Sequence, residues 1–132
     1  EKYGGFSTHK PWLGMTEEYP SVNAEEQIGK EGSIYEFYKE MIAFRQSGPY
    51  KDCLIYGKIC PVESSENVIA YKRYTEDETI YCWFNFGNEE SVEELEPKNL
   101  KQIWSNDKTA QIENHKLRLQ PFQALLLKEI EK

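Results

Sequence analysis

The sequence has 132 residues, of which 39% are hydrophobic and 14% aromatic, enough for one substantial core and an appendage. A formal net charge of −7, with Lys and Arg scattered along the chain, excludes nucleic acid and an anionic membrane surface as expected partners. The longest apolar run, residues 124–127, is far too short to span a membrane, and we expect a cytoplasmic protein.

Residues 1–32 read as an irregular leader, because they contain many Gly and Pro residues and show neither helical nor alternating periodicity. The leader nevertheless carries too many large apolar residues for a disordered segment: Phe6, Trp12, Leu13, Met15, Tyr19 and Val22. We therefore expect it to lie on a protein surface that receives these side chains. A short helical turn is predicted between Val22 and Ile28.

An amphipathic helix is predicted from Ser33 to Arg45. Ser33 and Glu36 fit a capping box, in which the hydroxyl accepts from the Glu36 amide and the carboxylate reaches back. Gly48-Pro49 should end the helix with a left-handed cap. The apolar face needs a large surface to bury against, and it consists of Ile34, Phe37, Tyr38, Met41 and Ile42.

From Leu54 onward the apolar residues alternate, which predicts short strands between turn residues. The segments are Leu54–Ile59, Val68–Tyr74, Thr79–Phe86, Ser91–Leu95, Lys101–Trp104, a piece around Ile112, Lys116–Leu119 and Phe122–Ile130. Within the third segment, Ile80, Cys82, Phe84 and Phe86 share one face, and Tyr81, Trp83 and Asn85 share the other. Seven or eight antiparallel strands at this spacing predict a mainly β fold, either a sandwich or a barrel.

The acidic residues are densest at Glu89, Glu90, Glu93, Glu94 and Glu96. Glycosidase chemistry needs two carboxylates held at a defined separation across a sugar. Nothing in the sequence fixes such a pair in a cleft, so a solvated strand edge is the favoured interpretation of this acidic group.

Other chemistry is equally unsupported. His9 and His115 stand in loop-like sequence without a nucleophile elbow, and the three cysteines lack metal-ligand spacing. We therefore expect no catalytic, cofactor-binding or metal-binding residue. Trp12 and Trp104 are candidate sugar contacts through their ring faces, whereas Trp83 is expected to pack in the core.

Several motifs resemble the α-glucosidases of the α-amylase superfamily, in the same order along nearly the whole chain. The stretch after the last barrel strand of that family resembles Gly5-Phe6, Lys10-Pro11-Trp12-Leu13, Tyr19, Val22-Asn23 and Gln27. Its final barrel helix resembles Ser33-Ile34, Tyr38-Lys39 and Ile42-Ala43-Phe44-Arg45. Strands of its C-terminal β-sandwich resemble Ala70-Tyr71-Lys72-Arg73, Phe84-Asn85-Phe86 and residues 119–124. Oligo-1,6-glucosidases, dextran glucosidases, trehalose-6-phosphate hydrolases and sucrose isomerases show the nearest motifs.

The resemblance implies a Greek-key sandwich at residues 53–132, preceded at residues 1–52 by the last loop and helix of a TIM barrel. It implies a retaining parent enzyme that acts on α-glucosides, with α-1,6-linked oligosaccharides as the expected substrates. The family's catalytic carboxylates lie upstream of the matched segment, so no residue here inherits a catalytic role. The expected partner is the catalytic barrel of the same polypeptide, and without it the helix face should repack or self-associate. A freestanding α-glucan-binding sandwich is the alternative.

Overall fold

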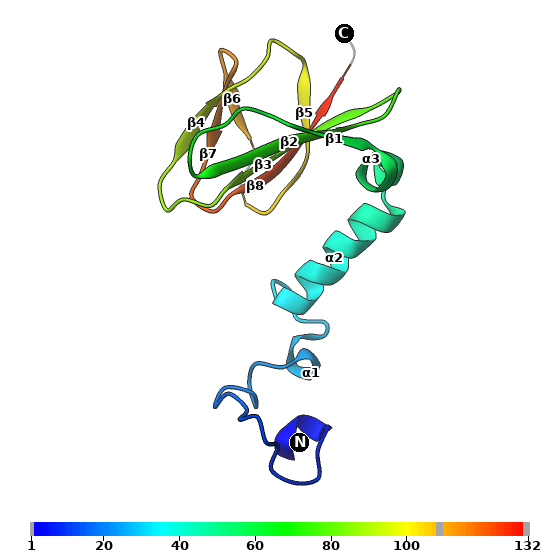
Figure 1. Ribbon diagram of the computed structural model, residues 1–132, viewed down its shortest axis with the longest axis vertical. Coiled ribbons are helices and arrows are strands. Elements are labelled where there is room, and N and C mark those ends of the chain that lie inside the picture. Colours follow the sequence, from blue (N-terminus) through cyan, green and yellow to red (C-terminus); the bar gives the residue numbers. More distant parts are fainter. Residues whose placement is uncertain (1, 108–109, 131–132) are drawn as a thin grey trace. The chain divides into compact units, whose positions relative to one another are not determined.

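The computed structural model describes residues 2–107 and 110–130. Two compact units divide the chain, Glu1–Gly48 and Pro49–Lys132 (Figure 1). The first contains the leader and the predicted helix, and the second contains all of the strands. The predicted boundary between residues 52 and 53 stays a prediction.

The first unit is helical where its sequence has capping residues. It contains a 3-10 turn η1 (Lys2–Gly5), a short helix α1 (Ala24–Gln27) and the longer helix α2 (Ile34–Ser47). The side chain of Asn23 caps α1, and that of Ser33 caps α2 by accepting from the Glu36 amide at 3.2 Å. The predicted helical turn and the predicted helix are therefore both confirmed.

Two details of the predicted α2 ends are wrong. The Glu36 carboxylate does not close the capping box; it accepts from the Gly29 amide at 2.7 Å and pairs with Lys39 at 3.1 Å. Gly48 ends the helix at φ −72° and ψ 171°, which is extended rather than left-handed. Left-handed glycines do stand at the other end of the helix, where Gly29 and Gly32, both at φ +74°, turn the chain just before α2.

The second unit begins with a helix that we predicted as a strand. Helix α3 (Lys51–Tyr56) occupies the first half of the segment Leu54–Ile59, and β1 (Lys58–Pro61) starts only after Gly57. A short apolar run fits either element by periodicity, and the choice depends on the surface that receives it. Cys53 and Leu54 are buried in this helix.

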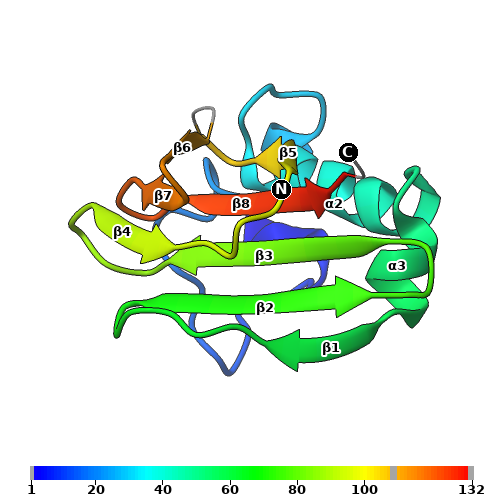
Figure 2. The same cartoon turned by 90° about the horizontal axis from the view of Figure 1, so that it is seen from above.

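The remaining strands lie within a few residues of their predicted positions. They are β2 (Val68–Tyr74), β3 (Thr79–Asn85), β4 (Ser91–Glu94), β5 (Leu100–Ser105), β6 (Gln111–Glu113), β7 (Lys116–Leu119) and β8 (Ala124–Glu129). They form a larger sheet in the order β1-β2-β3-β8-β5 and a smaller sheet in the order β4-β7-β6 (Figure 2). All paired strands are antiparallel, and the chain crosses between the sheets after β3, β4, β5 and β7. The predicted mainly β sandwich is confirmed.

The core lies between the two sheets. It consists of Val68, Ala70, Tyr81, Trp83, Leu125 and Leu127 from the larger sheet and Leu117 and Leu119 from the smaller sheet. Trp83 is therefore a core residue, as predicted. The register opposes Ala70 to Trp83 and Trp83 to Leu125, so alternate residues of these strands point to the outer face of the larger sheet.

Candidate functional site

The two predicted sugar contacts lie in different units. Trp12 belongs to the leader, and its side chain is 93% exposed, so its own unit leaves it almost uncovered. Trp104 is half-buried on β5, opposite Leu126 of β8, beyond an irregularity in the strand register. Their role in sugar contact stays a prediction.

The leader is fixed to the start of α2 by side chains of the residues that carry the family resemblance. The Gln27 side-chain oxygen accepts from the Tyr35 amide at 3.0 Å, and the Ser33 hydroxyl donates to the Gln27 carbonyl at 2.9 Å. The pKa of Glu36 is lowered, chiefly by the hydrogen bond from the Gly29 amide and to a smaller extent by that from Lys39. The carboxylate therefore stays ionised at the helix start. Asn23, Gln27 and Ser33 therefore have structural roles.

The apolar face of α2 is exposed within this unit. Ile34, Tyr38 and Ile42 are all exposed and line one side of a hollow of about 550 Å³, with Asn23 and Gln27 on the other side. Phe37 is exposed as well. Such a stripe of large apolar side chains is typical of a surface that another part of a protein covers.

The acidic group is not the uniformly solvated edge that we predicted, because Glu93 is buried at 5% exposure. Its carboxylate accepts from the Ser65 amide at 2.9 Å, from the Ser91 hydroxyl at 2.5 Å and from the Ser65 hydroxyl. Burial alone would raise the pKa of Glu93. The hydrogen bonds together outweigh burial and lower this pKa, and the bond from the Ser65 hydroxyl has the largest effect among them. Glu93 therefore fixes β4 to the loop before β2.

Three other acids of this group, Glu90, Glu94 and Glu96, are paired on the surface. Glu94 pairs with Lys116 at 3.4 Å, and Glu96 pairs with Lys98 at 3.2 Å. Glu90 accepts from Arg118 at 2.7 Å and from the Gln120 amide group at 2.9 Å. These contacts account for the three carboxylates without a chemical role and agree with the structural interpretation of the acidic group.

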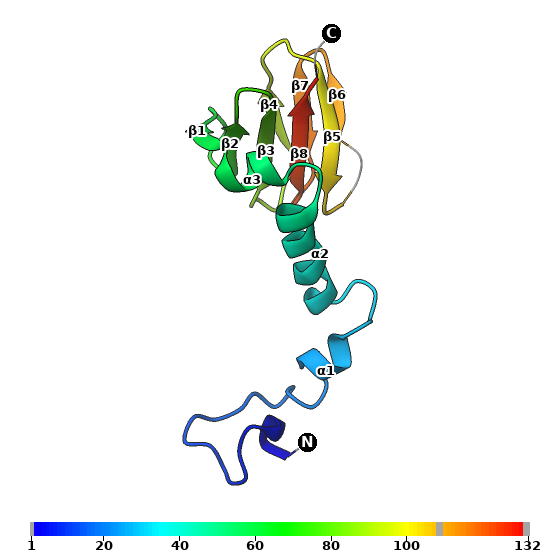
Figure 3. The same ribbon diagram turned by 90° about the vertical axis from the view of Figure 1, so that its right-hand side faces the viewer.

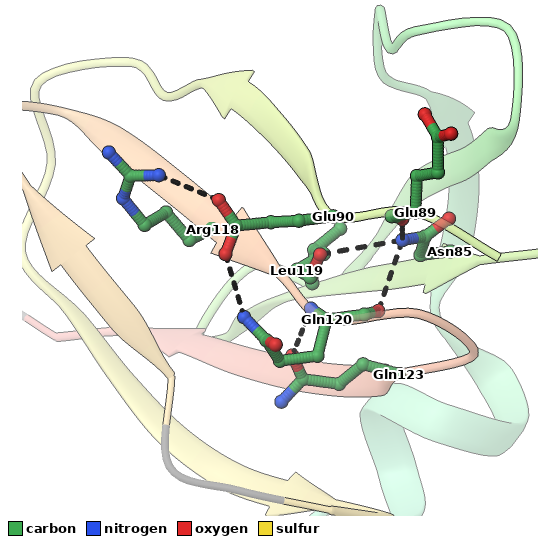
Figure 4. Close-up of polar contacts among 7 residues, drawn as sticks. All are labelled: Asn85, Glu89, Glu90, Arg118, Leu119, Gln120 and Gln123. Atoms are coloured by element: carbon green, nitrogen blue, oxygen red, sulfur yellow. Dashed lines mark hydrogen bonds and ion pairs between the residues drawn. The ribbon is translucent and has the colours of Figure 1, made fainter. Parts of the chain in front are cut away.

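A polar corner joins the ends of β3, β7 and β8 (Figure 4). The Asn85 side-chain nitrogen donates to the carbonyls of Glu89 at 2.9 Å and Gln120 at 3.0 Å, and its oxygen accepts from the Gly87 amide at 2.8 Å. The Gln123 side-chain oxygen accepts from the Gln120 amide at 3.0 Å. Both side chains are buried, so they satisfy backbone groups that water does not reach. Their signal in the sequence was their place in the motifs 84–86 and 119–124.

A cleft of about 690 Å³ opens between the loops that precede β2 and β5. Lys98 lies at this cleft, where its ammonium donates to the Tyr81 hydroxyl at 2.9 Å and to Glu129 at 3.1 Å. The pKa of Lys98 is raised, mainly by its hydrogen bond to Tyr81 and less by those to Glu129 and Glu96. This amine therefore stays protonated and cannot act as a general base. The buried Trp83 Nε1 also faces no hydrogen-bond partner among the described residues.

Metal chemistry has no support in the part of the chain that the structure describes, which contains no group of His, Cys, Asp or Glu residues able to hold an ion. His9 lies in the exposed leader, and His115 adopts φ 61° in the tight turn between β6 and β7. No helix among the described residues has the length and apolar character of a membrane span.

Comparison with known families divides the chain close to the same place as the fold does. Residues 1–57 match the catalytic domain of α-amylases, and residues 59–126 match the C-terminal domain of maltogenic amylases. The first match ends within one residue of the end of α3, and the second runs from the second residue of β1 to the middle of β8.

Two curated relatives are glucosidases. The chain is 28% identical to a probable α-glucosidase of Rhizobium meliloti over 88% of its own length and 20% of that protein. It is 39% identical to a probable oligo-1,6-glucosidase of Bacillus subtilis over 58% of its length and 14% of that protein. The chain thus spans about a fifth or less of the length of these relatives.

Solved structures show the same arrangement of elements. An isomaltulose synthase of Erwinia rhapontici superposes with a TM-score of 0.78 at 28% identity, over 96% of this chain and 23% of that one. A trehalulose synthase of Pseudomonas mesoacidophila superposes with a TM-score of 0.78 at 30% identity over the same shares. The chain therefore belongs to the α-amylase family, and its β-sandwich is a C-terminal domain of the maltogenic-amylase type.

Proposed function

We propose that this chain is the C-terminal region of an α-glucosidase, in which the sandwich stabilises the catalytic barrel and takes no part in the chemistry. The observation that supports this most directly is the order of the two family matches, catalytic domain first and C-terminal domain second, over residues 1–57 and 59–126. The parent enzyme would hydrolyse α-glucosides by the retaining mechanism, with α-1,6-linked oligosaccharides as substrates and the cytoplasm as its location.

The exposed apolar side chains support the same proposal. Trp12 in the leader and Ile34, Tyr38 and Ile42 on α2 need a large apolar surface, and the rest of a catalytic barrel provides one. In the absence of the barrel, this helix face would cause copies of the 132-residue chain to associate.

Hydrolysis of para-nitrophenyl α-glucoside tests the proposal. The 132-residue chain should release no nitrophenol, and the full-length protein, expressed from the reading frame that contains this segment, should turn the substrate over. Activity of the short chain, or inactivity of the folded full-length protein on α-glucosides of every linkage, would overturn it.

The exposure of Trp12 supports a second candidate, a sandwich module that binds α-glucan through Trp12 or Trp104. Isothermal titration of the short chain with maltooligosaccharides and isomaltooligosaccharides distinguishes the two functions. Saturable heat that Trp12→Ala or Trp104→Ala removes would favour binding, and no saturable heat would leave packing on the barrel as the role of both residues.

A further inference from the structure

The outer face of the larger sheet is unusually apolar. The strand register places Ile69, Phe84 and Ala124 in one row across this face. The next row contains Tyr71, Cys82, Leu126 and Trp104. The Tyr71 and Phe84 rings stack with their centroids 5.9 Å apart, and Cys82, opposite Tyr71 in the register, is buried, which raises the pKa of its thiol to about 11. Below we call Ile69, Tyr71, Phe84 and Trp104 the aromatic patch.

Helix α3 already covers one end of this face (Figure 3). Arg73 follows Tyr71 by two residues and therefore points to the same side of the sheet. Its guanidinium donates to the α3 carbonyls of Cys53 at 3.1 Å and Ile55 at 3.2 Å, and to that of Gly57 at 2.8 Å. The buried Cys53 and Leu54 lie in α3, and Ile80, opposite Arg73, is fully buried.

This helix belongs to the catalytic-domain match, which runs through residue 57. A segment of the catalytic domain is therefore seated on the outer face of the larger sheet inside the second unit itself. Beyond α3 the same face continues as the aromatic patch, in which Ile69 is 55% exposed and Tyr71, Phe84 and Trp104 are half-buried. Phe86, which follows Phe84 by two residues, is exposed at the far end of the face.

The outer face of the smaller sheet has the opposite character. Its rows contain Val92, Arg118 and Gln111, then Glu94, Lys116 and Glu113. Arg118 and Lys116 form ion pairs with Glu90 and Glu94, and the side chains of both pairs are largely exposed. Charged pairs of this kind are well solvated, and docking a second surface on them would cost their hydration.

We propose that the outer face of the larger sheet, centred on the aromatic patch, is the surface on which the catalytic barrel docks. The smaller sheet then faces solvent. This inference rests on the proposed function, since it requires a barrel in the same polypeptide. The barrel is the occupant because α3 extends the catalytic-domain match onto this face, and because the curated relatives contain about four-fifths of their length outside the matched segment.

Cysteine accessibility tests the proposal. Ile69→Cys places a thiol in the aromatic patch, and Val92→Cys, at a position 45% exposed on the smaller sheet, is the matched control. Each variant is labelled with a maleimide in the 132-residue chain and in the full-length enzyme, and peptide mass spectrometry separates the new thiol from Cys60. We expect labelling of Ile69→Cys to be at least about tenfold slower in the full-length enzyme, and labelling of Val92→Cys to be equal in both.

Equal labelling of Ile69→Cys in the two proteins, or protection of Val92→Cys instead, would overturn the proposal. Light scattering on the short chain reports self-association. Protection of Ile69→Cys that rises with the concentration of the short chain would assign the face to a second copy, and it would overturn the proposal that the barrel docks there. The α-glucosidase assay is read separately. An inactive full-length protein counts against the proposed function, whereas an active enzyme with unprotected Ile69→Cys counts against this inference alone.

Discussion

The two outer faces of the sandwich differ in what they bury. On the larger sheet, Arg73 binds the carbonyls of a packed helix, and Tyr71, Phe84 and Trp104 share their face with the buried Cys82 and Leu126. On the smaller sheet, Arg118 forms an exposed ion pair. The same residue type thus anchors packed backbone on one face and stays solvated on the other. The comparison indicates that composition alone does not identify a docking surface, whereas the partners of each side chain do.

The largest expected effect comes from exchanging the arginine of each face for alanine. Arg73→Ala leaves the α3 carbonyls without their charged donor and should lower the free energy of unfolding of the short chain by about 3 kcal/mol. Arg118→Ala removes an exposed pair and should cost less than about 1 kcal/mol. Urea unfolding measures both values. Equal losses would mean that the two faces do not differ as described.

An acidic residue in place of an exposed aliphatic one should separate the faces in the full-length enzyme. Ile69→Asp would bury a carboxylate against the barrel and should lower the temperature of half-inactivation by about 3 °C. Val92→Asp, on the solvated face, should change it by less than about 1 °C. A larger shift for Val92→Asp would assign docking to the smaller sheet.

Lowering the pH should test the stabilising role of Glu93 on the inner side of the smaller sheet. The folded-state pKa of Glu93 is lowered, so its stabilisation is complete above the ordinary glutamate pKa and is lost as the pH falls through the lower folded value. Glu93→Gln should cost about 1.5 kcal/mol at neutral pH, and the difference from the unsubstituted chain should shrink as the pH falls. Urea midpoints between neutral pH and about pH 3 provide the measurement. Glu90→Gln, at an exposed carboxylate, is the control, and a constant difference for Glu93→Gln would contradict the assignment.

The smallest effects are expected from one lysine on each face. Lys128 pairs with Glu78 at 2.6 Å and lies 5.4 Å from the centre of the Tyr50 ring, so Lys128→Ala should cost about 1 kcal/mol. Lys116→Ala, which removes an exposed pair at 3.4 Å, should cost less than about 0.5 kcal/mol. Thermal unfolding of the short chain resolves this difference, and a reversed order would show that exposure is a poor guide here.

Local signals predicted most of the elements. The strands Val68–Tyr74 and Lys116–Leu119 lie at their predicted bounds, and Ser33 caps the predicted helix. Each of these segments has an unambiguous period or a capping side chain. The segment Leu54–Ile59 has neither, and it became the end of α3 and the start of β1, because Arg73 and the sheet surface stabilise a helix there.

The candidate site was less predictable. Glu93 looks like its neighbours in sequence, and its hydrogen bonds to the distant Ser65, added to the one from Ser91, make it a buried structural group. The outer-face position of Trp104 depends on an irregularity between Gln102 and Trp104 in the pairing of β5 with β8. Neither relation is local, so no period or motif in one segment could reveal it.

The sequence by itself determined the helix α2, the alternating strands, the mainly β class and, through ordered motifs, the sandwich and the family. These depend on local periodicity, on capping and turn chemistry, and on residue types that short segments contain. Only the tertiary structure decided that α3 is a helix, that Glu93 is buried and that the two outer faces differ. The physical reason is that each of these depends on contacts between strands far apart in the sequence, where register and burial select among locally equivalent alternatives.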